Sequence, residues 1–227
     1  MKAEQLIFDL ARRPALARED FLVAPCNEDA MSLIDAWPEW SNPVALIHGP
    51  KGAGKTHIAR VWQSKSDARS IQCDGDLSKE IDALQANVPQ ALLIDNAQKF
   101  FHGGKDAQDF LFHVINTVKS KPACSLLMTS DTGPSGWSID LKDLDSRLKA
   151  AQIVEILPAD ETLLMGIFVK QLHDRQLQVD PDVVSYVINR LERSFDQVLK
   201  AVEKIDAASL KEKRRITLPF VKKTLSL

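Results

Sequence analysis

The residue pattern with the clearest chemistry in this sequence is a glycine-rich loop that ends in a lysine and a threonine. Residues 49–56 are a complete match to G-x-x-x-x-G-K-[ST]. In such a loop, backbone N–H groups turn toward phosphate oxygens, the lysine reaches the β- and γ-phosphates, and the hydroxyl binds Mg²⁺. A glycine-rich turn that only joins a strand to a helix is the alternative. The pattern predicts a nucleotide site built from Gly49, Pro50, Lys51, Gly52, Ala53, Gly54, Lys55 and Thr56.

A carboxylate follows another apolar run further along the chain. Asp95 comes directly after residues 91–94, and we expect it beside the phosphates, where Asp95 and Thr56 would hold the Mg²⁺ of a bound ADP or ATP. An aspartate that only caps a loop is the alternative. Asn96 comes next, and an amide can position water but cannot take its proton at pH 7. We therefore expect weak intrinsic ATP hydrolysis.

Two more polar groups have spacings that suit a phosphate site. Asp131 ends the run 125–131, which predicts a position beside Asp95 that faces the γ-phosphate, although a plain turn fits equally well. Arg147 lies between the sheet and the following helical region, so its guanidinium could neutralise charge in a neighbouring protein's phosphate site. The alternative for Arg147 is a surface ion pair with Asp143 or Asp145.

These residues need a scaffold, and the hydrophobic pattern predicts one. Short apolar runs at residues 44–47, 70–73, 91–94, 125–129 and 153–156 alternate with helical periods, which is typical of an α/β fold with a parallel sheet flanked by helices. After Pro158 only helical patterns remain, so a small all-helical domain is expected. The predicted divisions are a tail at residues 1–13, a nucleotide-binding core at 14–158 and a helical domain at 159–227.

Composition excludes several classes of protein. The chain has 227 residues, of which 44% are hydrophobic, and this is enough apolar mass for a core. Its 29 Lys and Arg against 31 Asp and Glu give a net charge of −2, which disfavours a protein that coats nucleic acid. No run of about 20 apolar residues predicts a membrane helix. Three cysteines without metal-ligand spacing fit a cytoplasmic protein with ordinary thiols.

Taken together, residues 49–56, 94–96, 129–131 and 146–148 resemble the AAA+ ATPases of the DnaA clade. The closing segment 216–223 resembles the Hda family within that clade. The resemblance spans nearly the whole chain and implies an AAA+ core with a helical lid, ADP or ATP with Mg²⁺ as cofactor, and DnaA as a partner. It implies that Arg147 acts as an arginine finger on ATP bound to DnaA, which represses re-initiation of replication. It also places Asn27 in the segment that cradles adenine.

The first residues of the chain resemble another family motif. Gln5-Leu6-Ile7-Phe8-Asp9-Leu10 is similar to the clamp-binding hexapeptide Q-L-x-[LF]-x-L. In that motif the glutamine is a hydrogen-bonding anchor, while Leu6, Phe8 and Leu10 would fill a preformed groove. The implied partner is the DNA polymerase III sliding clamp (beta subunit), and DNA is then reached mainly through the clamp. A strand or helix that packs on its own domain is the alternative, and the resemblance leaves room for a homo-oligomer.

One lid position departs from the DnaA pattern, and one basic run has two possible interpretations. The resemblance aligns Asp196 with a lid arginine of DnaA. The contact of that arginine with the terminal phosphate is then lost, unless Arg190 or Arg193 replaces it. The basic run 211–215 could touch DNA, although a solvated helix end is the better interpretation.

Two other functions fit the same fold: an autonomous ATPase of helicase-loader type, and an adaptor that uses nucleotide only for stability.

Overall fold

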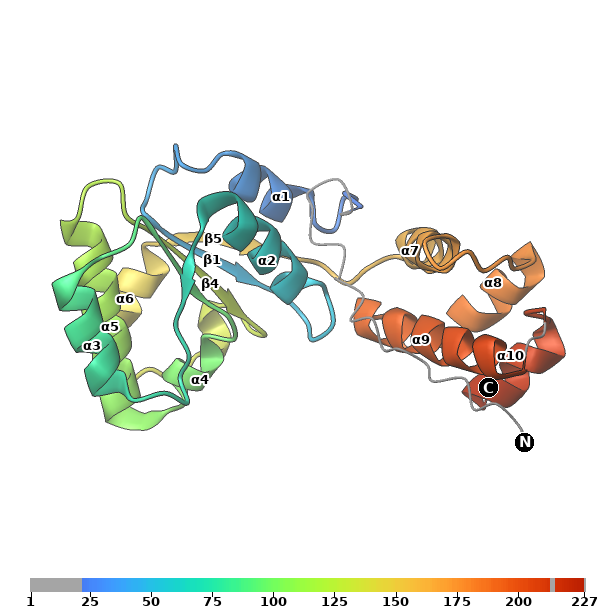
Figure 1. Ribbon diagram of the computed structural model, residues 1–227. Helices are drawn as coiled ribbons and strands as arrows, with labels where there is room; N and C mark the ends of the chain where they lie inside the picture. The colour runs from blue at the N-terminus through green and yellow to red at the C-terminus, as the bar shows by residue number, and fades with distance from the viewer. Residues whose placement is uncertain (1–21, 213–214, 227) are drawn as a thin grey trace, which may run out of the picture.

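A parallel β-sheet forms the centre of the N-terminal part of the molecule (Figure 1). The computed structural model describes residues 22–212 and 215–226. Within them the sheet has five strands in the order β2-β3-β4-β1-β5. Their bounds are β1 (Val44–His48), β2 (Arg69–Ser70), β3 (Ala91–Ile94), β4 (Ser125–Ser130) and β5 (Gln152–Glu155). The predicted α/β class is confirmed, and the strand order places β1 between β4 and β5.

Helices cover both faces of this sheet because its strands are apolar on both sides. Alternate residues of β1 point to opposite faces: Leu46 joins one buried cluster, and Ala45 and Ile47 join the other. The first face is covered by α3 (Leu77–Ala86), α4 (Gln98–Phe101), α5 (Gly104–Ser120) and α6 (Lys142–Lys149). The second face is covered by α1 (Glu28–Asp35) and α2 (Lys55–Ser66). A short 3-10 helix, η2 (Pro134–Gly136), follows β4.

The strand expected at residues 70–73 is shorter than predicted. β2 ends at Ser70, although the Ile71 backbone N–H still donates to the Leu93 carbonyl at 2.8 Å. The neighbouring strand β3 ends at Ile94, and Asn96 adopts a left-handed backbone with φ of 61°. Residues 72 and 73 therefore have no extended partner with which to continue the ladder.

The C-terminal part is helical, as predicted, and lies to one side of the sheet (Figure 1). Its helices are α7 (Glu161–His173), α8 (Pro181–Ile188), α9 (Phe195–Glu212) and α10 (Leu218–Leu225). The Asp160 side chain caps α7 by accepting from the Leu163 N–H at 2.7 Å, and Pro181 occupies the first turn of α8. The four helices enclose a buried cluster that includes Phe168, Val187 and Val202. We refer to residues 161–225 as the lid and to the sheet with its helices as the core.

Two further points concern the ends of the chain and membranes. The expected tail 1–13 and the first part of the expected core, residues 14–21, lie outside the described residues. Leu22, where the description begins, packs against the buried cluster of the lid. Among the described helices, none is long and apolar enough to cross a membrane.

Candidate functional site

A cavity of about 570 Å³ lies where the carboxyl ends of the strands, the start of α2 and the lid meet. Residues from the glycine-rich loop, from the ends of β3 and β4, and from α7 and α9 share its wall. Its lining residues are Leu22, Asn27, Lys51, Gly52, Gly54, Lys55, Thr56, His57, Arg60, Asn96, Asp131, Ile167, Lys170, Gln171, Phe195, Asp196 and Leu199. The structure therefore brings most of the predicted nucleotide-site residues to one place.

The glycine-rich loop has the backbone that its sequence requires. Gly52 and Gly54 both lie in the left-handed region, with φ of 78° and 90°, which glycine adopts without strain. Helix α2 starts immediately afterwards at Lys55, so its free N–H groups face the cavity. The partial positive charge of a helix N-terminus favours an anion such as a phosphate.

Lys55 is buried at the base of the loop, with 6% of its side chain exposed. Its ammonium donates to the backbone carbonyls of Gly49 at 2.8 Å and Pro50 at 2.9 Å. It also forms an ion pair with the Asp131 carboxylate at 2.9 Å. Asp131, which was expected beside Asp95 and facing a γ-phosphate, lines the cavity, and its ion pair is with the lysine.

Asp95 joins the loop to the neighbouring strand through two hydroxyl groups. Thr56 donates to one carboxylate oxygen at 2.9 Å, and Thr129 donates to the other at 2.5 Å. The Thr129 hydroxyl in turn accepts from the Asn96 backbone N–H at 2.9 Å. A carboxylate and a hydroxyl side by side are hard oxygen ligands of the kind that Mg²⁺ prefers. The residues present therefore fit a magnesium nucleotide.

Asn27 lines the cavity and is buried, with 1% exposure, and its side chain also holds the loop in which it lies. Its amide oxygen accepts from the Ala24 N–H at 2.9 Å, and its amide nitrogen donates to the Leu22 carbonyl at 3.1 Å. These bonds close the loop before α1 and bring Leu22 to the cavity wall. The resemblance also implies that Phe21 and Val23 belong to the segment that cradles adenine; Val23 is 46% exposed, and Phe21 lies outside the described part of the chain.

The lid contributes residues that the sequence alone did not single out. Apolar side chains from α7 and α9, Ile167 and Leu199, form part of the wall together with Lys170 and Gln171. The backbone N–H of Phe195, at the start of α9, donates to the Gly52 carbonyl at 2.9 Å. The lid therefore contacts the phosphate loop directly. Only a tertiary contact reveals this, because helical spacing alone makes such positions look like lid core.

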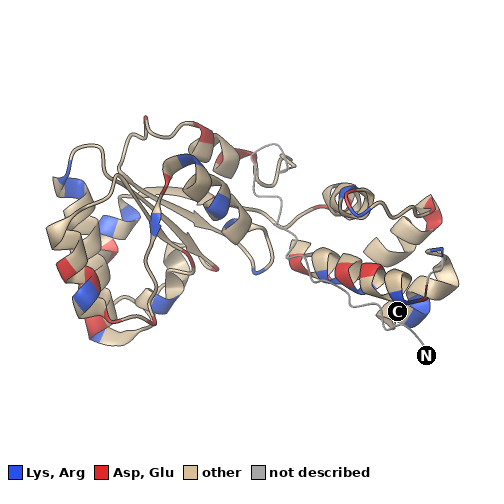
Figure 2. Ribbon diagram, in the orientation of Figure 1, with Lys and Arg blue, Asp and Glu red and all other residues tan. Residues whose placement is uncertain are grey.

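Asp196 also faces the cavity, where it pairs with Lys200 at 2.6 Å. Figure 2 shows both basic and acidic residues along α9. Arg190 and Arg193 are absent from the cavity wall, and the Arg190 guanidinium lies 3.8 Å from the centroid of the Tyr186 ring. The lid position expected to hold an arginine thus carries a carboxylate neutralised by a lysine.

Arg147 is half-buried on α6 and does not line the cavity. Its guanidinium lies over the Phe112 ring of α5, 5.2 Å from the ring centroid. The alternative, a surface ion pair of Arg147 with Asp143 or Asp145, is not formed, and Asp145 instead pairs with Lys149 at 2.7 Å. Within the described residues, no carboxylate lies within ion-pair distance of Arg147.

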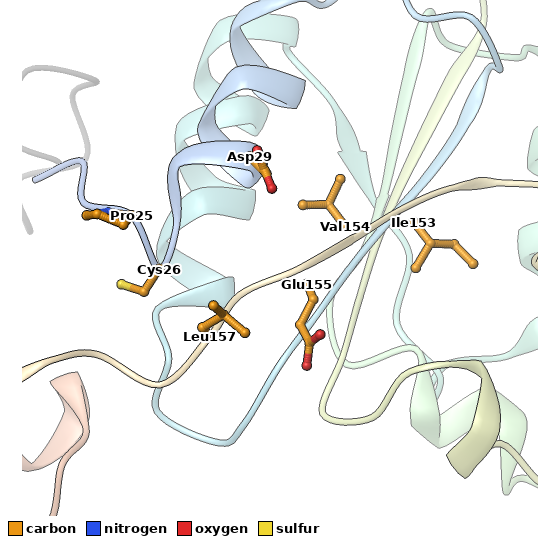
Figure 3. Close-up of a pocket in the computed structure, with 7 residues that line it drawn as sticks. All are labelled: Pro25, Cys26, Asp29, Ile153, Val154, Glu155 and Leu157. Carbon is orange, nitrogen blue, oxygen red and sulfur yellow. The ribbon is translucent and has the colours of Figure 1, made fainter.

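Several of the remaining expected residues are not among those that the structure describes. The hexapeptide residues Gln5, Leu6, Phe8 and Leu10 are outside the described residues, as are Lys213 and Arg214 of the basic run. A second cavity of about 490 Å³ lies along β5, where Asp29 lies near Val154 and Cys26 lies near Leu157 (Figure 3). None of the sequence-predicted site residues lines this second cavity.

Sequence relatives agree with this architecture. Residues 161–225 match the family model described as "Hda, lid domain". The chain is 29% identical over 191 residues to an uncharacterized protein of Haemophilus influenzae, with 82% of each chain covered. It is 25% identical over 234 residues to the chromosomal replication initiator protein DnaA of Caulobacter vibrioides, covering 91% of this chain and 47% of DnaA. The chain therefore spans about half the length of that DnaA.

The fold has a solved counterpart of nearly the same extent. Domain III of the replication initiation protein DnaA from Thermotoga maritima superposes with a TM-score of 0.79 at 22% identity. The match covers 94% of this chain and 97% of the other. The core and the lid together therefore have the same fold as that DnaA domain.

Proposed function

We propose that this chain, which has an AAA+ fold and a lid that matches the Hda lid model, stimulates hydrolysis of ATP bound to DnaA. In this proposal it binds ADP or ATP with Mg²⁺, docks through residues 5–10 on the DNA-loaded sliding clamp, and presents Arg147 to the ATP site of DnaA. The result is repression of re-initiation. The observation that supports it most is Arg147, an arginine outside the chain's own cavity that rests on Phe112 without a carboxylate partner among the described residues.

The chain's own nucleotide has a mainly conformational role in this proposal. Lys55 would hold its phosphates, and Thr56 with Asp95 would hold Mg²⁺, which neutralises phosphate charge when bound. Asn96 lines the cavity where a second carboxylate would be needed to take a proton from water. Asp196, paired with Lys200, contributes no positive charge toward a terminal phosphate. Both features support slow hydrolysis by this protein alone.

Arg147 is chemically suited to act on another protein's nucleotide. A guanidinium offers five N–H donors in a planar fork, and a π face holds it without using those donors. Arginines supplied in trans accelerate phosphoryl transfer by about 10³ to 10⁵ in other systems. If Arg147 were paired with Asp145, that ion pair would have to break before the guanidinium could bind a phosphate. Its contact with Phe112 leaves the guanidinium N–H donors available.

The clamp supplies proximity in this proposal. A short apolar peptide with Gln5 as its polar anchor can dock in a preformed groove independently of the AAA+ body. Tethering DnaA and this chain near the same DNA raises their effective concentration. DNA then need not be gripped directly, which agrees with a net charge of −2.

The experiment measures hydrolysis of DnaA-bound ATP with loaded clamp and ADP, using the wild-type chain, Gln5→Ala and Arg147→Ala. We expect Gln5→Ala to raise the concentration needed for stimulation and Arg147→Ala to abolish stimulation at every concentration. A plain adaptor would lose activity only with Gln5→Ala. Rapid ATP turnover by the chain alone, lost in Lys55→Ala, would instead indicate an autonomous motor.

A further inference from the structure

We propose that Gln98 is a positioning residue of the nucleotide site, which fixes the Asp131 carboxylate against Lys55 and ties that site to α4 and α5. Gln98 is the first residue of α4 and lies outside the cavity wall. It belongs to neither the glycine-rich loop nor the Asp95-Asn96 pair. The inference deepens the proposed nucleotide site and rests on that part of the proposed function.

The contacts of Gln98 form a two-point clamp on Asp131. Its amide nitrogen donates to the Asp131 carboxylate at 3.1 Å, and its amide oxygen accepts from the Asp131 backbone N–H at 3.3 Å. The same nitrogen lies 3.4 Å from the amide oxygen of Asn96. The carboxylate oxygen of Asp131 that Gln98 does not hold is the one paired with Lys55 at 2.9 Å. One side chain therefore sets which oxygen faces the lysine.

Only a glutamine satisfies this arrangement among side chains of its size. The carboxylate of Asp131 requires a donor, and the backbone N–H requires an acceptor, so a single primary amide serves both. A glutamate would keep the acceptor but lose the donor, and it would place a second negative charge beside Asp131. A leucine would fill similar space and provide neither bond. The Asp131 side chain is 41% exposed, so its carboxylate is held by the Lys55 ion pair on one oxygen and by Gln98 on the other.

The clamp also connects the cavity to the helices that support Arg147. The two phenylalanines that end α4, Phe100 and Phe101, are buried, and Phe100 stacks on Phe110 of α5 with centroids 5.6 Å apart. Helix α5 then carries Phe112, on which the Arg147 guanidinium rests. A change at Lys55 and Asp131 is thus passed to α4 through Gln98, and from α4 to packed side chains of α5.

The test is a double-mutant cycle on ADP affinity, measured by titration of the full chain with no DnaA present. We expect Gln98→Leu to weaken ADP binding by about 3- to 10-fold, the factor that corresponds to one net hydrogen bond. Gln98→Glu should weaken it at least as much despite its similar shape. If Gln98 acts through Asp131, then Gln98→Leu added to Asp131→Ala should have no further effect on ADP affinity.

A matched control separates positioning from general stability. Gln63 on α2 also uses its amide for two hydrogen bonds, to the Ala68 carbonyl at 3.0 Å and the Ser70 hydroxyl at 2.9 Å. Gln63→Leu should lower the melting temperature without changing ADP affinity. Hydrogen exchange provides a second readout: ADP should slow exchange in α4 and the first turns of α5 in the wild type, and this slowing should be lost in Gln98→Leu.

The outcomes distinguish this inference from the proposal on which it rests. Lys55→Ala that still binds ADP normally would overturn the nucleotide site itself. Loss of ADP binding in Lys55→Ala, together with additive effects of Gln98→Leu and Asp131→Ala, would overturn only the role of Gln98. An unchanged ADP affinity in Gln98→Leu would do the same.

Discussion

Replacing Gly52 by alanine is expected to disturb the contact between lid and phosphate loop. An added Cβ at this position would lie 2.7 Å from the Cβ of Ser194 and 3.0 Å from its hydroxyl oxygen. The Gly52 carbonyl also accepts the N–H of Phe195, so the two segments cannot separate without losing that bond. Either the loop or the start of α9 must move.

The expected loss in the free energy of unfolding has two parts, which can be separated by comparing two glycines of this chain. A left-handed backbone costs a residue with a side chain about 1–2 kcal/mol, and overpacking a fitted contact costs about 1–3 kcal/mol. We therefore expect Gly52→Ala to lose about 2–5 kcal/mol. Gly104 has the same φ of 78° with no atom within 4 Å of an added Cβ. Gly104→Ala should show the backbone part alone.

Urea unfolding monitored by tryptophan fluorescence measures this loss in the core. All four tryptophans, Trp37, Trp40, Trp62 and Trp137, lie in the core and none in the lid. ADP affinity, measured alongside, should fall clearly in Gly52→Ala and stay near normal in Gly104→Ala. If Gly52→Ala loses no more stability than Gly104→Ala and binds ADP normally, the lid does not press on the phosphate loop as described.

Three further predictions concern other contacts. Phe112→Leu should reduce stimulation of DnaA by about 2- to 5-fold, because an exposed cation–π contact contributes about 0.5–1 kcal/mol. Phe112→Tyr keeps an aromatic ring and should keep the stimulation, and assays of DnaA-bound ATP hydrolysis with each variant measure both effects. Lys200→Met should weaken ATP binding more than ADP binding, because Asp196 would then be an unneutralised charge at the cavity wall; competition titrations measure it. Burial lowers the pKa of His48 below its ordinary value of 6.5, so the unfolded state binds more protons and stability should fall as pH drops below that value. His48→Gln should flatten this pH dependence in urea unfolding.

Local patterns were sufficient to predict the sheet and most of the phosphate site. The apolar runs that became β1, β3 and β4 needed only their hydrophobicity and length, and the loop motif fixed Lys55 and Thr56. Asp95 could be placed because parallel strands end at a common edge. The shortening of β2 could not be predicted, since it depends on the left-handed turn at Asn96 in the neighbouring loop.

The residues that sequence reasoning missed act through tertiary contacts. Gln98 is distant in sequence from Asp131, and Phe112 is distant from Arg147, so neither pair has a local signature. Ile167 and Leu199 carry the same helical spacing as ordinary lid core, and only the lid's position shows that they line the cavity. Asn27, in contrast, was singled out by resemblance, and its hydrogen bonds were not predicted.

For Asn27, the resemblance implied a place in the segment that cradles adenine, and the structure shows the residue at the cavity wall with both polar atoms of its side chain bonded to its own loop. A buried amide needs partners, and the nearest backbone groups supply them. Leu22 and Asn27 both line the cavity, so the loop that these bonds close forms part of the cavity wall. Sequence similarity identified the segment but not the atoms.

The central claim is that Arg147 acts on ATP bound to DnaA, and a single-turnover assay tests it most directly. DnaA preloaded with labelled ATP is mixed with DNA-loaded clamp, ADP and either wild type, Arg147→Ala or Lys142→Ala. Lys142 is an exposed cation on the same helix, so its variant controls for charge. We expect Arg147→Ala to reduce hydrolysis to the rate of DnaA alone while Lys142→Ala matches the wild type. Hydrolysis at the wild-type rate with folded, ADP-bound Arg147→Ala would contradict the claim.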